Sequence, residues 1–177
     1  CLILWINVPS ILRSRTPMIN QAGEYALRAV VHLARRDGLQ PASASDIAEA
    51  TKVPQAYLQK ILRTLTKQGL LTAQRGMGGG FMLAKLPSAI SVLEVLNACD
   101  SGPNRIERCP LGITGHTQLC SLHRLIDQQT ASVVSVFAST SIADLINNQD
   151  LIRPLCDPNT SCSATVDIKV SDNQHEN

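Results

Sequence analysis

The 177-residue sequence contains few aromatic side chains, which limits the kind of core that it can form. Phenylalanine, tyrosine and tryptophan make up 3% of the residues, while 44% of the chain is hydrophobic. A core with so few aromatic rings must be built from leucine, isoleucine, valine and alanine, as is typical of helical proteins. The length suits one domain with an additional element, or two very small domains.

The chain also has little net charge. The formal value is +2, which argues against a polybasic tail and favours binding through a shaped surface. The cations are locally concentrated, because six of them fall between residues 43 and 85: Lys52, Lys60, Arg63, Lys67, Arg75 and Lys85. A local cluster of this kind is compatible with a nucleic-acid surface.

There is no long hydrophobic run and no secretory signal pattern. The apolar opening, residues 1–8, is too short to span a bilayer, and Arg13 and Arg15 follow it, whereas a signal peptide places its cations first. The first methionine is Met18, so we interpret residues 1–17 as a disordered leader or an over-long start. We expect no membrane partner and a cytoplasmic, reducing location, where clustered cysteines are metal or redox sites.

A catalytic constellation is missing as well. The sequence shows no nucleophile with a matched base and no paired carboxylates at working spacing. Its glycine-rich run lies between two strand-like segments, unlike the phosphate-binding loop of nucleotide-binding proteins. We therefore predict that the protein is not an enzyme.

The chain does contain a helix-turn-helix pattern over residues 43–69. Ser45 is the expected N-cap of the first helix, and acidic residues follow it in the first turn. Pro54 pushes the preceding residue out of the helical region and suits the first turn of a second helix. Gly69 ends that helix. The apolar residues of the second helix form a narrow stripe: Leu58, Ile61, Leu62 and Leu65.

A hairpin pattern follows the second helix. Residues 70–73 and 81–84 are strand-like, and the basic, glycine-rich segment 74–80 separates them. A helix-turn-helix with a glycine-tipped hairpin predicts a winged-helix reader of double-stranded DNA, whose second helix enters the major groove. The alternative is a small helical domain whose hairpin is only a turn. The residues expected at the DNA are Ser45, Gln55, Tyr57, Gln59, Lys60, Arg63, Lys67 and Arg75, with Gly76, Gly78 and Gly79 shaping the wing.

Further helices are expected on both sides of this unit. Residues 19–36 form an amphipathic helix, and residues 87–100 form a short connecting helix. Residues 120–147 contain neither proline nor glycine and predict one long helix, whose apolar residues suggest that it crosses the partner subunit of a homodimer. The alternative is a helix folded back on its own domain. The polar tail, 148–177, is expected to be disordered.

These segments resemble the IscR/NsrR/CymR family of bacterial transcription regulators. The resemblance covers roughly Met18 to Asn147 and is most specific in the run Arg75-Gly-Met-Gly-Gly-Gly-Phe81. It implies a mainly α fold with a small β-hairpin, in which a winged helix-turn-helix (18–86) precedes a connecting helix, a cysteine loop and a long dimerisation helix (87–147). It also implies a homodimer that regulates transcription from a pseudo-palindromic operator. Many family members carry an iron–sulfur cluster in that loop, and some carry none.

Four side chains suited to metal ligation lie within fifteen residues of one another. They are Cys109, His116, Cys120 and His123. Thiolate and imidazole are ligands of both iron–sulfur clusters and zinc. Cys120 and His123 are three residues apart at the start of a helix, so their side chains can share one face. Cys99 is interpreted instead as a small apolar side chain, and Cys156 and Cys162 as exposed thiols of the tail.

The family pattern has a third cysteine between Cys109 and Cys120, and this sequence lacks it. The resemblance also implies a carboxylate ligand from the partner's first helix, at the position of Glu24. One interpretation is a [2Fe–2S] cluster held by the two cysteines, a histidine and Glu24, which senses redox state, nitric oxide or iron–sulfur status. A second is a clusterless regulator whose two cysteines act as a thiol switch, and a third is zinc bound by two cysteines and two histidines. A non-DNA iron–sulfur carrier module is the alternative from a different class.

Overall fold

The computed structural model describes residues 18–36, 40–110 and 118–147. Our expectations for 1–17 and 148–177, and for His116, Cys156 and Cys162, lie outside these ranges. The elements are α1 (Gln21–Arg35), α2 (Ala44–Thr51), α3 (Gln55–Lys67), β1 (Leu71–Gln74), β2 (Gly80–Leu83), the 3₁₀ turn η1 (Pro87–Ala89), α4 (Val92–Ala98), α5 (Ser121–Ser139) and α6 (Ile142–Asn147). The fold is mainly α with one antiparallel hairpin, as the sequence predicts.

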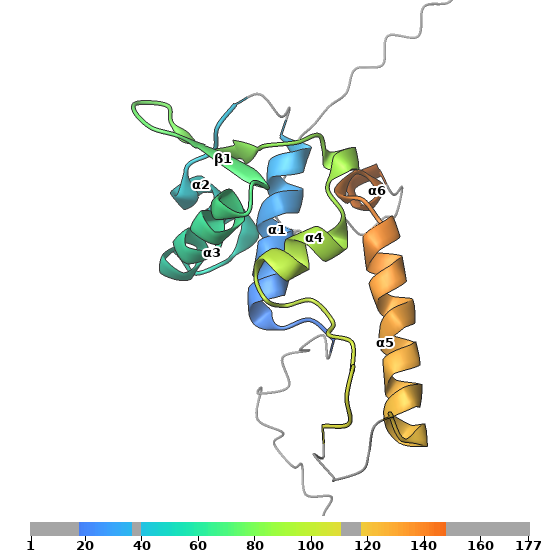
Figure 1. Cartoon of the computed structure of the whole chain (residues 1–177). Coiled ribbons are helices and arrows are strands. Elements are labelled where there is room, and N and C mark those ends of the chain that lie inside the picture. Colours follow the sequence, from blue (N-terminus) through green and yellow to red (C-terminus); the bar gives the residue numbers. More distant parts are fainter. Residues whose placement is uncertain (1–17, 37–39, 111–117, 148–177) are drawn as a thin grey trace, which may run out of the picture.

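Helix α1 lies in the middle of a head formed by α1–α4, the hairpin and α6 (Figure 1). It packs against α2 and α3 as well as α4 and α6. The core is aliphatic, as expected from the composition. Its largest fully buried side chains are Ile47, Leu58, Leu62, Leu65, Leu71, Ile90, Leu96 and Ile142. Helix α5 stands beside this head and extends beyond it, on the side away from α3.

The helix-turn-helix is present, but its caps differ from the prediction. Ser43 is the N-cap of α2 and accepts a hydrogen bond from the Asp46 amide at 3.2 Å, so Ser45 lies inside the helix. The chain stays extended up to Ser43 because Ala42 pairs with Phe81 through two backbone hydrogen bonds. Pro54 is the residue before α3, with a non-helical ψ of 125°. The expected stripe of α3 is buried.

The hairpin is shifted by one residue from the predicted strands. Leu71 pairs with Leu83, and Gln74 pairs with Gly80. The Leu70 carbonyl still accepts a hydrogen bond from the Ala84 amide at 3.0 Å, but the Leu70 amide donates to the Leu65 carbonyl and closes the end of α3, so β1 begins only at Leu71. Gly69, with a φ of 73°, ends that helix as predicted. The hairpin therefore begins directly at the end of α3, and the wing projects from the head beside it (Figure 1).

The prediction of one helix over residues 120–147 is wrong. Helix α5 ends at Ser139 and α6 begins at Ile142. Between them, the Thr140 carbonyl accepts from the Val92 amide and the Ile142 amide donates to the Ile90 carbonyl, at 2.9 and 2.8 Å. This bridge places Ile142 in the core, where it is fully buried. No helix within the described ranges is both long and apolar enough to cross a bilayer.

The predicted helix over 87–100 is likewise divided. Residues 87–89 form the 3₁₀ turn, and α4 begins only after Ser91. Ser91 and Glu94 form a reciprocal capping box, in which each side chain binds the other's backbone amide. The hydrogen bond that the Ser91 amide donates to the Glu94 carboxylate is the main reason why the pKa of Glu94 is lowered. Ser141 and Asp144 repeat the arrangement at the start of α6.

Candidate functional site

The exposed face of α3 carries the polar side chains that the sequence assigns to DNA. Its apolar stripe is buried against α1 and α2, which leaves the opposite face to solvent. Apart from Ala56, the exposed residues on this helix are Gln55, Tyr57, Gln59, Lys60, Arg63 and Lys67. Helix α3 contains no aspartate or glutamate, so every charged side chain on this face is a cation. A protruding helix of this kind has the shape and charge to enter a major groove.

Tyr57 is held by side chains from α1. Its ring meets the Tyr25 ring edge-on, with 5.8 Å between centroids, a favourable aromatic geometry. Gln21 donates a hydrogen bond to the Tyr25 hydroxyl at 2.8 Å, and the Arg28 guanidinium lies 5.9 Å from that ring's centroid. Tyr57 nevertheless remains 41% exposed. It is therefore oriented by α1 and still accessible on the α3 face.

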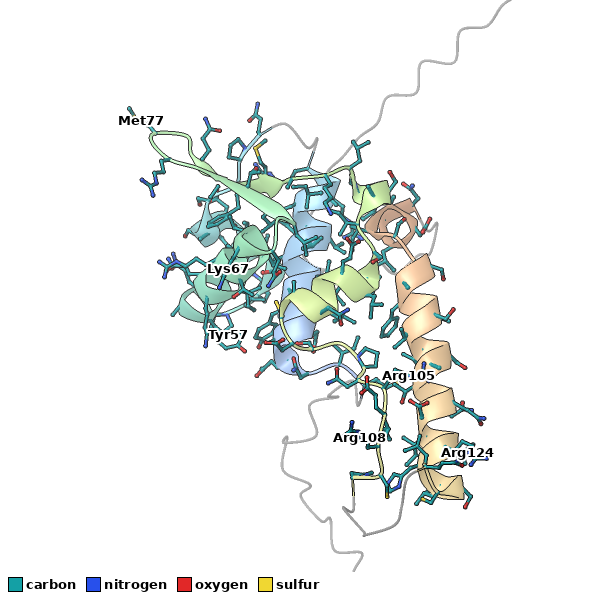
Figure 2. The ribbon with its side chains drawn as sticks, viewed as in Figure 1. Tyr57, Lys67, Met77, Arg105, Arg108 and Arg124 are labelled. Carbon is teal, nitrogen blue, oxygen red and sulfur yellow. The ribbon has the colours of Figure 1, made fainter. Side chains whose placement is uncertain are left out.

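Met77 lies at the tip of the wing (Figure 2), and both Met77 and Arg75 are exposed. Gly76 and Gly78 have positive φ values of 103° and 78°, a conformation that glycine adopts at little cost. The Gly79 amide donates to the Gly76 carbonyl at 3.0 Å and closes the turn. The sequence reading did not single out Met77, because a side chain between glycines carries no periodicity that would predict its exposure.

Two cysteines and one histidine come together at the start of α5. The Nδ1 atom of His123 lies 3.2 Å from the Cys120 sulfur and 3.6 Å from the Cys109 sulfur. Cys120 is the N-cap residue of α5, and Cys109 approaches from the preceding loop. All three side chains are half-buried. We call these three residues the thiol–imidazole cluster.

The cluster supplies part of a metal-binding donor set. Tetrahedral zinc with ordinary bond lengths would separate a ligating sulfur from a ligating nitrogen by about 3.6 Å, close to the two distances observed. Over the residues that the structure describes, however, no group of three or more histidine, cysteine and carboxylate side chains can hold a metal ion by itself. Further donors are needed from elsewhere.

Glu24 is engaged within its own chain. On α1 its carboxylate forms an ion pair with Arg28 at 2.5 Å. Arg28 also donates to the Thr51 carbonyl, at 3.3 Å, at the carboxyl end of α2. The predicted carboxylate donor is thus linked, through one arginine, to the turn of the helix-turn-helix.

The loop between α4 and α5 is anchored to other elements at two points. At its start, the buried Ser101 hydroxyl donates to the Asn20 side chain at 2.6 Å, and Asn20 also caps α1. Farther along, Arg105 and the Ile106 amide bind Asp127 of α5. Cys99, just before the loop, packs against the core, and burial raises the pKa of its thiol. That thiol is apart from the thiol–imidazole cluster.

The family model named Rrf2, described as an iron-dependent transcriptional regulator, matches residues 19–148. The chain belongs to the Rrf2 family. Members of this family are transcriptional regulators and not enzymes, so both of those predictions are confirmed.

Individual Rrf2 relatives agree with the resemblance to IscR, NsrR and CymR. The chain is 32% identical to the HTH-type transcriptional regulator IscR of Yersinia pseudotuberculosis over 137 residues, 76% of this chain and 82% of that protein. It is 29% identical to NsrR of Bacillus licheniformis, covering 75% and 94%. The structure of CymR, the global cysteine regulator of B. subtilis, matches with a TM-score of 0.62 and 25% identity, covering 72% and 94%.

The Rrf2 match spans the head, the loop and α5, so both groups of predicted site residues fall inside it. The structure places the α3 and wing residues on one exposed side of the head and brings three predicted ligands together at α5. Glu24 lies on α1 and His116 outside the described residues. The contacts of Asp127 were not foreseen, because Arg105 and Asp127 are 22 residues apart and nothing local relates them.

Proposed function

We propose that this Rrf2 protein binds a pseudo-palindromic operator as a homodimer and regulates transcription in response to the state of its thiol–imidazole cluster. The observation that carries the proposal is the exposed, carboxylate-free face of α3 beside the basic wing. In the proposed complex α3 lies in the major groove, where Gln59 can pair with adenine. Arg75 follows the groove edge and meets phosphate or the minor groove.

The homodimer is proposed from the outer face of α5. No residue of this helix is buried, although its sequence is rich in leucine, isoleucine and valine. An apolar stripe at helical spacings of three, four and seven is formed by Leu122, Leu125, Ile126, Val133 and Val136. Pairing two such stripes across a two-fold axis would cover them and present two α3 helices about 34 Å apart, one turn of DNA.

An iron–sulfur cluster is the ligand that we propose for the thiol–imidazole cluster. Cys109, Cys120 and His123 would supply three donors, and Glu24 of the partner subunit or His116 would supply a fourth. Mixed thiolate and nitrogen ligation of a [2Fe–2S] cluster is chemically sound. Bound there, the cluster would supply one-electron redox chemistry. Metal ligation by Glu24 would draw negative charge away from its ion pair with Arg28, whose hydrogen bond to Thr51 reaches the helix-turn-helix.

Zinc and a metal-free thiol pair remain the alternatives. Both sulfurs lie against one imidazole nitrogen, a geometry that suits a tetrahedral ion as well as a cluster. A carrier module that does not bind DNA is separated from a regulator by a gel shift on the chain's own promoter region. Sequence-selective, salt-dependent retardation supports the regulator, and its absence supports the carrier.

The metal centre can be tested by anaerobic purification with iron, sulfide and zinc analysis of one sample. We expect visible absorption with equal amounts of iron and sulfide. Cys109→Ala, Cys120→Ala and His123→Ala should lose both, because each removes a donor atom of the cluster. Cys99→Ala is the matched control and should keep them, since its thiol faces the core. A colourless wild-type protein would exclude the iron–sulfur proposal, and its zinc content would then decide between the alternatives.

The DNA interface can be tested at the wing. We expect Arg75→Ala to weaken operator binding and to lower the slope of log K against log salt by about one for each wing, since one phosphate contact is lost. Binding should be measured by fluorescence anisotropy at several salt concentrations. Arg108→Ala removes the same charge from the loop near α5 and should leave the slope unchanged. Equal slopes for wild type and Arg75→Ala would remove Arg75 from the phosphate contacts.

A further inference from the structure

The loop that carries Cys109 is fastened to α5 by a single carboxylate. Arg105 donates two hydrogen bonds to Asp127, from Nε to Oδ1 and from its terminal nitrogen to Oδ2, both at 2.6 Å. The Ile106 amide donates a third to Oδ1 at 2.9 Å. A bidentate arginine–carboxylate pair fixes direction as well as distance. Both oxygens of Asp127 are therefore committed to holding residues 105 and 106.

The position of this contact relates it to the thiol–imidazole cluster. Asp127 lies four residues after His123 on α5, one helical turn away and on the same side. Arg105 lies four residues before Cys109 in the loop. We call the contacts of Asp127 with Arg105 and Ile106 the clamp. The clamp therefore fixes the loop one helical turn away from the point where the Cys109 sulfur approaches His123. Figure 2 shows Arg105 between the loop and α5, whereas Arg108 projects from the other side of the loop.

The clamp is charged at all physiological pH values. Hydrogen bonding to Arg105 is the main cause that lowers the pKa of Asp127 to about 2. Because this folded-state pKa lies below the ordinary value, the interaction is complete above pH 4 and is lost only as pH falls towards 2. The Asp127 side chain is also only 14% exposed, against 52% for Arg105. The contact between Arg105 and Asp127 is therefore kept at neutral and alkaline pH.

Without the clamp, Cys109 would be tethered to Cys120 and His123 only by the chain. Ten residues lie between the two cysteines, and a free segment of that length samples many arrangements with its ends apart. Bringing the sulfur back to the imidazole would then cost conformational entropy each time a ligand is bound. A loop that is already fastened one turn away has lost most of that freedom beforehand.

We propose that Asp127 is the positioning residue of the thiol–imidazole cluster, and that it acts by clamping Arg105 and Ile106 so that the Cys109 sulfur stays beside His123. Asp127 itself is not a ligand of the proposed metal. Loss of a supporting contact of this kind typically weakens metal binding about 10–100-fold. The inference rests on the proposed metal-binding function, but it also predicts the proximity of the two thiols in metal-free protein.

The first experiment titrates the reduced, metal-free protein with Co²⁺, whose thiolate bonds absorb in the near ultraviolet. We expect Asp127→Asn and Arg105→Ala each to weaken Co²⁺ binding at least tenfold, because each removes one partner of the Arg105–Asp127 ion pair. Arg108→Ala, a loop arginine without an ion pair to any described residue, is the matched control and should change binding less than twofold. Circular dichroism and thermal unfolding establish that each variant is folded.

The second experiment measures thiol proximity without metal. In protein whose other four cysteines are alanine, the Cys109–Cys120 pair is equilibrated with oxidised and reduced glutathione. Each disulfide formed transfers two electrons to one glutathione disulfide and releases two molecules of glutathione. We expect Asp127→Asn and Arg105→Ala to lower the effective concentration of the two thiols at least tenfold, with Arg108→Ala unchanged.

The outcomes separate the two proposals. Failure of wild type to bind Co²⁺ would count against the metal site, while the glutathione equilibrium would still decide whether Asp127 positions the loop. If both clamp variants match Arg108→Ala in the glutathione equilibrium, the positioning role is overturned. A loss of Co²⁺ binding with unchanged thiol proximity would overturn it as well, because the effect would then not act through Cys109.

Discussion

Replacing Leu125 and Ile126 together with glutamate is expected to convert the proposed homodimer into a monomer and to weaken operator binding by about two to four orders of magnitude. Both side chains lie on the apolar stripe of α5 and are 54% and 43% exposed in the single chain. Two carboxylates placed in a two-fold interface meet two more from the partner, without cations on that stripe to pair with them. Losing the second head removes an avidity gain of about 10²–10⁴.

Sedimentation velocity and anisotropy with operator DNA would measure the two effects on the same samples. Gln128→Glu with Ser135→Glu adds the same charge on a different, exposed face of α5 and is the matched control. It should remain dimeric and bind normally, apart from a small general loss through charge. A Leu125 and Ile126 double variant that is still dimeric would place the interface elsewhere.

Ile142→Ala should produce a large loss of stability without touching the proposed DNA and metal sites. Ile142 is fully buried at the point where α6 enters the core. Removing its outer carbons leaves a cavity, which typically lowers the free energy of unfolding by about 2–5 kcal/mol for such a deletion. For a chain of this size that corresponds to a fall in Tm of roughly 10 °C.

Differential scanning calorimetry would check this expectation. Leu86→Ala removes a similar side chain that is 73% exposed, and its Tm should lie within about 2 °C of wild type, as for ordinary surface changes. An unchanged Tm for Ile142→Ala would show that α6 is not an integral part of the head. Both variants should retain the α-helical circular dichroism signal at 20 °C.

Local sequence signals predicted the elements whose structure depends on neighbouring residues. The stripe of α3 and the glycine that ends it follow from spacing and backbone preference, and both are confirmed. The N-cap of α2 was wrong because Ser43 and Ser45 both precede acceptable amide partners. The choice is made by the pairing of Ala42 with Phe81, 39 residues later, which no short window contains.

Contacts between residues distant in sequence also contribute to the division of the predicted long helix and to the geometry of the thiol–imidazole cluster. Residues 120–147 contain no proline or glycine, and two kinds of contact end α5 where it ends: the distant pairing of Thr140 and Ile142 with the segment before α4, and the local capping pair Ser141–Asp144 at the start of α6. The proximity of Cys120 and His123 follows from their spacing on one helix. The approach of Cys109 to His123 depends in addition on the contact between Arg105 and Asp127. These two residues are 22 positions apart, so no local sequence pattern predicts their contact.

The break at Thr140 also determines how α5 can move. Helix α5 meets the head at its carboxyl end, through Phe137 and the bridge at Thr140, and it is held by the loop at Asp127. A rotation of α5 would therefore be centred on the bridge at Thr140, and Asp127 lies about 20 Å from this point along the helix. A displacement of about 1 Å of the loop at Asp127 tilts the helix by about 3° and moves its far end by about 1.4 Å. In the proposed two-fold dimer both α5 helices would turn together, so a small change around the two sulfurs would change the distance between the two DNA-reading heads.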